Sequence, residues 1–130
     1  MEVGQVHSEH IEITPQLVKD FAHVSGDFNP LHLDPEYAAT TQFKRPIAHG
    51  MLSSALLSGI IGTRFPGRGT VLLSAELKFS RPIFVGDRVL FRLTVEHVRS
   101  DKPIISLLCE VFNPEGQITA SGKTIVRGPL

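Results

Sequence analysis

The 130-residue chain has little cysteine, no tryptophan and no excess charge of either sign. Its one cysteine, Cys109, has no partner within the chain, which excludes an internal disulfide and is typical of a reducing compartment. Cys109 stands in an apolar strand pattern, so we expect a small buried side chain. The 13 basic and 13 acidic side chains cancel, and neither sign is clustered. This pattern argues against the basic surface that binding to nucleic acid or to an anionic membrane requires.

The chain also lacks a long hydrophobic run and a targeting segment. It begins Met1-Glu2-Val3-Gly4-Gln5, with neither the basic start nor the apolar stretch of a signal peptide. The longest mostly apolar segment, residues 51–61, is interrupted by serines and a glycine and is shorter than the ~20 residues that span a bilayer. We therefore predict a cytoplasmic protein without a membrane segment. Because this length suits one core, and repeats and linkers are absent, residues 1–130 are predicted to form a single domain.

Three segments carry helix signals. Thr14-Pro15 is typical of a helix start, because threonine caps a free N–H and proline is tolerated at the first helical position. The apolar stripe that follows is expected to end near Gly26. Asp34-Pro35 repeats the pattern and predicts a short second helix. The third segment, residues 50–62, has no charged residue and is apolar around nearly its whole circumference, so we expect a buried helix.

From Thr70 onward the hydrophobic period changes to two, which predicts half-buried β-strands. The strands expected here are residues 70–80, 89–96, 104–112 and 118–126, preceded by a weaker one near residues 6–13. About five mostly antiparallel strands and one buried helix pack economically as a curved sheet wrapped around the helix, which is an α+β fold. Such a sheet leaves two open edges. We therefore predict a homodimer, with a sheet that continues across the two subunits as the favoured arrangement.

The segment between the first two predicted helices holds a carboxylate and an imidazole five residues apart. On a continuous helix Asp27 and His32 would point about 140° away from each other, since a helix has about 3.6 residues per turn. Pro30 argues against that helix, because it removes a backbone donor and favours an extended Asn29. We therefore predict a bend that directs both side chains into one cavity as an acid/base pair.

The same segment resembles a family signature. Ser25-Gly26-Asp27, Asn29-Pro30 and His32, then Ala38, Phe43, Arg45-Pro46 and Ile47-Ala48-His49-Gly50-Met51, are similar to the motif of the R-specific enoyl-CoA hydratases, or MaoC-like dehydratases. The resemblance implies a hot-dog fold and a hydro-lyase that adds water reversibly to a trans-2-enoyl thioester, giving an (R)-3-hydroxyacyl thioester. It also implies that Asp27 and His32 are the catalytic pair and that no metal or redox cofactor takes part. The implied partner is a thioester of CoA or of acyl carrier protein.

Hydration of an enoyl thioester needs a base for the water, an acid for C2 and a donor that stabilises charge on the thioester oxygen. We expect Asp27 chiefly to activate the water and His32 to transfer the proton to C2, although a strongly coupled pair titrates as a unit. Gly50 stands at the start of the uncharged central helix, where free N–H groups and the positive end of the helix dipole point outward. Its amide is therefore our candidate donor for the thioester oxygen.

Three further residues are candidates for substrate binding. Asn29 is expected to fix the water or to brace the bend. Ser58 lies two turns along the central helix from Gly50 and is a candidate for lining the acyl pocket. His49 is a candidate either for direct substrate contact or for a structural hydrogen bond at the start of that helix.

Several other functions fit parts of this pattern. Asp27, His32, Asp34 and His49 are of ligand types that bind zinc or iron, but their spacing is not a recognised ligand pattern and hydration needs no Lewis acid, so we predict no metal. A hot-dog thioesterase is disfavoured, because residues 51–61 hold no carboxylate. A non-catalytic acyl-thioester binding module would not need the Asp27 and His32 pair. An (R)-3-hydroxyacyl-ACP dehydratase of fatty acid synthesis stays open, as does the preferred acyl length.

Overall fold

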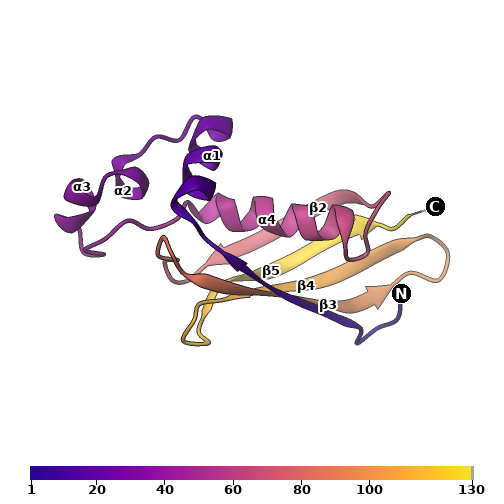
Figure 1. Cartoon of the computed structure of the whole chain (residues 1–130). Coiled ribbons are helices and arrows are strands. Elements are labelled where there is room, and N and C mark those ends of the chain that lie inside the picture. Colours follow the sequence, from indigo (N-terminus) through magenta and orange to yellow (C-terminus); the bar gives the residue numbers. More distant parts are fainter. Residues whose placement is uncertain (130) are drawn as a thin grey trace.

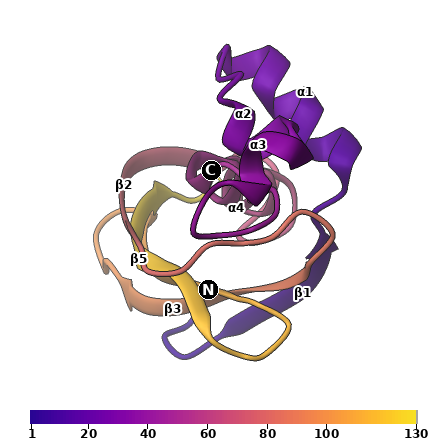
Figure 2. The same cartoon turned by 90° about the vertical axis from the view of Figure 1, so that its left-hand side faces the viewer.

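A computed structural model describes residues 1–129, in which a five-stranded antiparallel sheet curves around one long helix. The strands are β1 (Val6–Glu12), β2 (Val71–Phe79), β3 (Arg88–Val98), β4 (Ile104–Phe112) and β5 (Ile118–Arg127). The helices are α1 (Pro15–Ser25), α2 (Pro30–Leu33), α3 (Pro35–Ala39) and α4 (Gly50–Thr63). Helix α4 runs along the concave side of the sheet, and α1, α2 and α3 gather at one end of it (Figures 1 and 2).

The sheet order is β1-β3-β4-β5-β2, and every neighbouring pair is antiparallel. The three consecutive strands β3, β4 and β5 form the middle, while β1 and β2 form the two edges. Buried and partly exposed positions alternate along β4 and most of β3, which confirms the strands predicted from the period of two. Cys109 is fully buried in β4 as a free thiol, as expected.

Helix α1 begins and ends at the residues that the sequence predicts. The Thr14 side chain accepts a hydrogen bond from the Leu17 N–H at 3.0 Å, which satisfies one of the free donors of the first turn. Gly26 ends the helix with a φ of 78°, a left-handed conformation in which a Cβ is strained. The chain therefore leaves α1 abruptly, one residue before Asp27.

The second predicted helix is also present, but it is preceded by a shorter one. Asp34 caps α3 through the N–H groups of Glu36 and Tyr37, as the Asp-Pro pattern predicts. Helix α2 was not predicted. Pro30 is its first helical residue and Asn29 is its cap. Four residues are too few to give a periodic signal, so the sequence indicated only that the chain bends here.

The core lies between α4 and the concave face of the sheet. On the helix its members are Leu52, Leu57, Ile60 and Ile61, and on the sheet they include Phe91, Leu93, Leu107 and Val126. None of the helices in residues 1–129 combines the length and apolar content needed to cross a membrane.

Two elements are more exposed in this single chain than the sequence predicts. Met51 is 60% exposed, and Ala55, Ser58 and Gly59 are exposed as well, so α4 is not buried on all sides. Strand β2, predicted to be half-buried, is exposed at every position except Leu77. Relative to Met51, the other three positions lie four, seven and eight residues further along, which is the spacing of one helix face. One edge of the sheet and one face of its central helix are thus left uncovered.

Candidate active site

Short polar side chains hold the bend between α1 and α2. Ser25 Oγ donates to the Phe21 carbonyl oxygen at 2.7 Å and accepts from the Asp27 N–H at 3.1 Å. Asp27 Oδ1 in turn accepts from the Asn29 N–H at 3.1 Å. Asn29 Oδ1 then accepts from the Leu31 N–H at 3.1 Å. Each side chain fixes the backbone two residues further along, which is how such residues stabilise turns. Asn29 therefore braces the bend, one of the two roles expected for it.

This bend brings Asp27 and His32 together, with His49 as a third member. One carboxylate oxygen of Asp27 and one ring nitrogen from each histidine all lie within 4.8 Å of one another. Asp27 is exposed, His32 is half-buried, and His49 is only 3% exposed. The three side chains come from the bend, from α2 and from the cap position of α4. An exposed carboxylate is thus placed beside an imidazole that is partly withdrawn from water.

A backbone contact fixes the tautomer of His32. Its Nδ1 lies 2.6 Å from the Ile47 carbonyl oxygen. A carbonyl oxygen only accepts, so Nδ1 carries the proton, and Nε2 of the neutral ring is an open acceptor. Burial lowers the pKa of His32 and His49 lowers it further, while the bond to Ile47 and the Asp27 carboxylate raise it, and the net direction is downward. His32 is therefore neutral at neutral pH and presents a basic Nε2.

The two histidine rings lie close together and are tilted. Their centroids are 3.9 Å apart and their planes are inclined by 31°. A metal ion binds an imidazole through a ring nitrogen that carries no proton. His32 Nδ1 and His49 Nε2 are occupied by backbone carbonyl oxygens. The arrangement suits proton transfer better than metal ligation.

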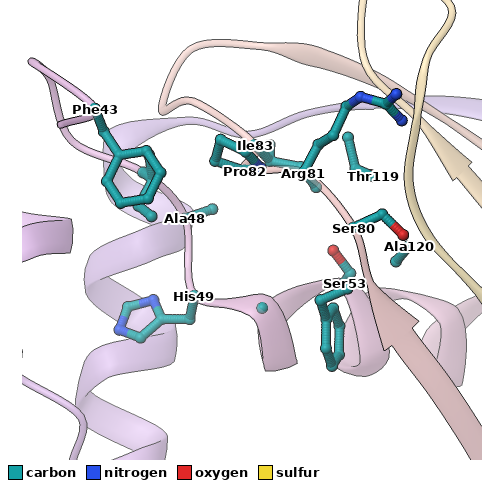
Figure 3. A pocket seen from close by; sticks show the side chains of 13 residues that line it. Phe43, Ala48, His49, Ser53, Ser80, Arg81, Pro82, Ile83, Thr119 and Ala120 are labelled. Atoms are coloured by element: carbon teal, nitrogen blue, oxygen red, sulfur yellow. The ribbon is translucent and has the colours of Figure 1, made fainter.

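Helix α4 begins beside this cluster, at Gly50. The Gly50 N–H makes no hydrogen bond within the described chain, as expected for the first residue of a helix. A Cβ at this position would lie 3.4 Å from the ring of Phe79, so that ring borders the start of the helix. Gly50 and His49 line a cavity of about 350 Å³ together with Phe43, Ile47, Ala48, Ser53, Phe79, Ser80, Arg81, Pro82, Ile83, Thr119 and Ala120 (Figure 3).

Asp27 and His32 do not belong to the residues that line this cavity within residues 1–129. Figure 3 shows the ring of His49 turned away from Ser53 and Ser80. Through that ring the wall of the cavity is connected to the Asp27 and His32 pair. The cavity and the pair are thus neighbours, with His49 between them.

Ser58 lies elsewhere, in a second cavity of about 370 Å³ between α4 and β2. Its other lining residues are Met51, Ser54, Leu57, Ile61, Leu72, Ala75, Leu77, Phe79 and Thr124, most of them apolar. Phe79 lines both cavities, so they adjoin at its ring. Sequence reasoning missed Phe79, because the strand period marks it only as one of several apolar positions. The structure does not bring Ser58 to the Asp27 and His32 pair.

Residues 2–108 match the family model of the MaoC like domain. This chain belongs to the MaoC-like domain family. The MaoC-like chain is 44% identical over 129 residues to the (R)-specific enoyl-CoA hydratase of Aeromonas caviae, covering 99% of this chain and 96% of that protein. It is 34% identical over 129 residues to the 3-hydroxybutyryl-CoA dehydratase of Methylorubrum extorquens, covering 99% and 82%. A solved structure of the A. caviae (R)-hydratase matches it with a TM-score of 0.96 over 99% of this chain and 98% of that one. This match confirms the predicted hot-dog fold of the MaoC-like chain.

Proposed function

We propose that this MaoC-like protein catalyses the reversible hydration of a trans-2-enoyl-CoA to an (R)-3-hydroxyacyl-CoA. The observation that supports this most directly is the meeting of Asp27, His32 and His49 atoms within 4.8 Å beside the start of α4. It occurs in a chain with 44% identity over nearly its whole length to an (R)-specific enoyl-CoA hydratase. Dehydration of the hydroxyacyl thioester is the same reaction in reverse, and the levels of the two metabolites set the net direction.

In this mechanism Asp27 and His32 act on one water molecule. The water lies between the Asp27 carboxylate and His32 Nε2, and its oxygen attacks C3 of the enoyl thioester. The proton released by the water passes to Nε2, which then delivers it to C2. Because both groups stand on the same side of the substrate, the hydroxyl and the hydrogen add to one face. With His32 neutral, the proton that reaches C2 is the one taken from the water.

Gly50 and Ser58 bind the substrate in this proposal, and Asn29 supports the site from the bend. The Gly50 N–H, at the positive end of the α4 dipole, stabilises the charge that develops on the thioester oxygen. The cavity of about 370 Å³ takes the acyl chain, with Ser58 on its wall. Asn29 acts through the bend, since its side-chain oxygen holds the Leu31 N–H.

The proposed reaction is tested by incubating the protein with crotonyl-CoA. We expect the absorbance of the conjugated enoyl thioester to disappear and (R)-3-hydroxybutyryl-CoA to accumulate, with no free thiol. Release of free CoA would instead assign a thioesterase, and binding without turnover would assign a binding module. A much higher kcat/KM with crotonyl-ACP than with crotonyl-CoA would show that the enzyme acts on thioesters of acyl carrier protein rather than of CoA.

We further propose that the enzyme is a cytoplasmic homodimer of single-domain subunits. A single buried core cluster supports one domain, and the buried free thiol of Cys109 suits a reducing compartment. Strand β2 is an unpaired edge, and Val71, Leu72, Leu73 and Phe79 on it are 45–55% exposed. Pairing β2 with its copy would cover this edge and the exposed face of α4. The acyl cavity, which lies between these two elements, would then be enclosed by the partner subunit.

Replacing Leu72 by glutamate is expected to dissociate the dimer, because it places a carboxylate on an apolar edge that is 45% exposed in the single chain. Light scattering after size-exclusion chromatography measures the mass. The matched control is Val24→Glu, since Val24 is 85% exposed on α1, away from β2, and this variant is expected to stay dimeric. A wild-type protein that is a fully active monomer would contradict the proposal.

A further inference from the structure

His49 connects the three parts of the proposed active site. It is the cap residue of α4 and directly precedes Gly50 in the chain. Its ring reaches across to the bend, where Nε2 lies 2.9 Å from the main-chain oxygen of Asp27. The ring lies against that of His32, tilted by 31° with 3.9 Å between centroids, and the ring of Phe21 packs against it at 4.9 Å. A side chain in this position fixes where the acid/base pair lies relative to the Gly50 amide.

The protonation state of His49 follows from its surroundings. The Asp27 carbonyl oxygen only accepts, so Nε2 of His49 must carry the hydrogen and donate it. The other nitrogen, Nδ1, is buried and has no hydrogen-bond partner in residues 1–129. The hydrogen bond to the bend is therefore donated by Nε2, while Nδ1 takes no part in it.

The groups that surround His49 agree with this assignment. From the bend it meets Asp27, from α2 it meets the neutral His32, and from α1 it meets the apolar ring of Phe21. Its contact with Asp27 runs through the backbone and does not engage the carboxylate. His49 is therefore a buried donor whose contacts are with the backbone of the bend and with the rings of His32 and Phe21.

We infer that His49 is a positioning residue of the hydratase, which holds the backbone of Asp27 and the ring of His32 in place for proton transfer. The inference rests on the proposed function. The hydrogen bond from Nε2 prevents the bend from moving away from α4, and the close contact between the two rings restricts rotation of His32. Since a displacement of about 1 Å can lower a rate up to about 10²-fold, loss of this link should reduce kcat. Substrate affinity should change little, because the ring is turned away from Ser53 and Ser80 on the cavity wall.

Two variants of nearly equal size separate the hydrogen bond from simple packing. In His49→Gln, the side-chain amide can still donate to the Asp27 carbonyl oxygen. In His49→Met, a side chain of similar length and volume fills the same space without a donor. With crotonyl-CoA we expect His49→Met to lower kcat about 10-fold with KM within about 2-fold of wild type, and His49→Gln to recover kcat to within about 3-fold.

The outcome is checked by steady-state kinetics and by the NMR spectrum of the His32 ring nitrogens. In wild type and in His49→Gln we expect the His32 signal of a neutral ring protonated on Nδ1, and in His49→Met we expect a mixture of tautomers or broadened signals. Equal kcat in both variants, or a rise of KM that accounts for the whole loss, would overturn the positioning role. The NMR signature can be read whether or not the wild type hydrates crotonyl-CoA, so failure of the proposed reaction is distinguished from failure of this inference.

Discussion

Replacing His32 by alanine is expected to lower kcat/KM for crotonyl-CoA hydration by at least about 10²-fold, as is usual when a general acid/base group is removed. The reason is that His32 lies beside the Asp27 carboxylate and keeps Nε2 open as a proton acceptor. Asp27→Asn should cause a loss of similar size, because a neutral amide lacks the negative charge that activates the water whose proton passes to His32. Since the two groups handle one proton as a unit, the double variant should be little slower than either single variant.

Matched substitutions on the same protein control for general damage. Asp20→Asn changes an exposed carboxylate on α1 whose partner is Gln16, and His10→Ala changes an exposed histidine on β1. Both are expected to keep wild-type kcat/KM. Should Asp27→Asn or His32→Ala retain activity within a few-fold of these controls, Asp27 and His32 would not be the acid/base pair.

The pH profile gives the same experiment a second measurement. The pKa of His32 is lowered by burial, so its neutral form exists down to a pH below the ordinary value of about 6.5. Only the neutral ring accepts the proton of water. The kcat/KM of wild type should therefore stay level at neutral pH and decline as pH falls through a value below about 6.5. The residual activity of His32→Ala should lack this decline.

The local structure around the pair was predictable from the sequence because it depends on residues close together in the chain. The Thr14 cap and the left-handed Gly26 fix both ends of α1, and Pro30 prevents a continuous helix through the next residues. These short-range constraints suffice to predict the bend that brings the side chains of Asp27 and His32 close to each other. The strand periods of β3 and β4 likewise gave their buried faces, since alternation needs no knowledge of distant residues.

The rest of the site depends on contacts between distant parts of the chain, which no local pattern specifies. The tautomer of His32 is set by the Ile47 carbonyl, 15 residues away, and the role of His49 by the Asp27 carbonyl, 22 residues away. Helical spacing placed Ser58 two turns from Gly50, but it could not predict which cavity Ser58 lines. The apolar residues around the circumference of α4 predicted a helix that is buried on all sides. An apolar helix face does not reveal, however, whether the same chain or another one covers it. In the single chain that face is open at Met51.

Replacing Gly122 by alanine is expected to have the largest effect on stability of any single substitution considered for this protein. Gly122 lies in β5 between Cys109 of β4 and Leu77 of β2. A Cβ at this position would lie 1.8 Å from the main-chain oxygen of Glu76 and 2.8 Å from its carbonyl carbon. Both are backbone atoms, which cannot rotate away as a side chain can. The added methyl group must therefore push β2 away from β5.

We expect Gly122→Ala to lower the free energy of unfolding by about 3 kcal/mol or more, at the upper end of the cost of overpacking, and to lower Tm by about 10 °C or more. The variant should also lose activity, because β2 carries Leu77 and Phe79 into the cavities that we assign to the substrate.

Gly62→Ala is the matched control, since a Cβ there meets no atom within 4 Å and the residue lies in the regular helix α4. Alanine in a helix is more stable than glycine by about 0.5–1 kcal/mol, so this control should raise Tm slightly. Thermal unfolding followed by circular dichroism measures both variants, and equal Tm values would mean that β2 does not approach β5 this closely.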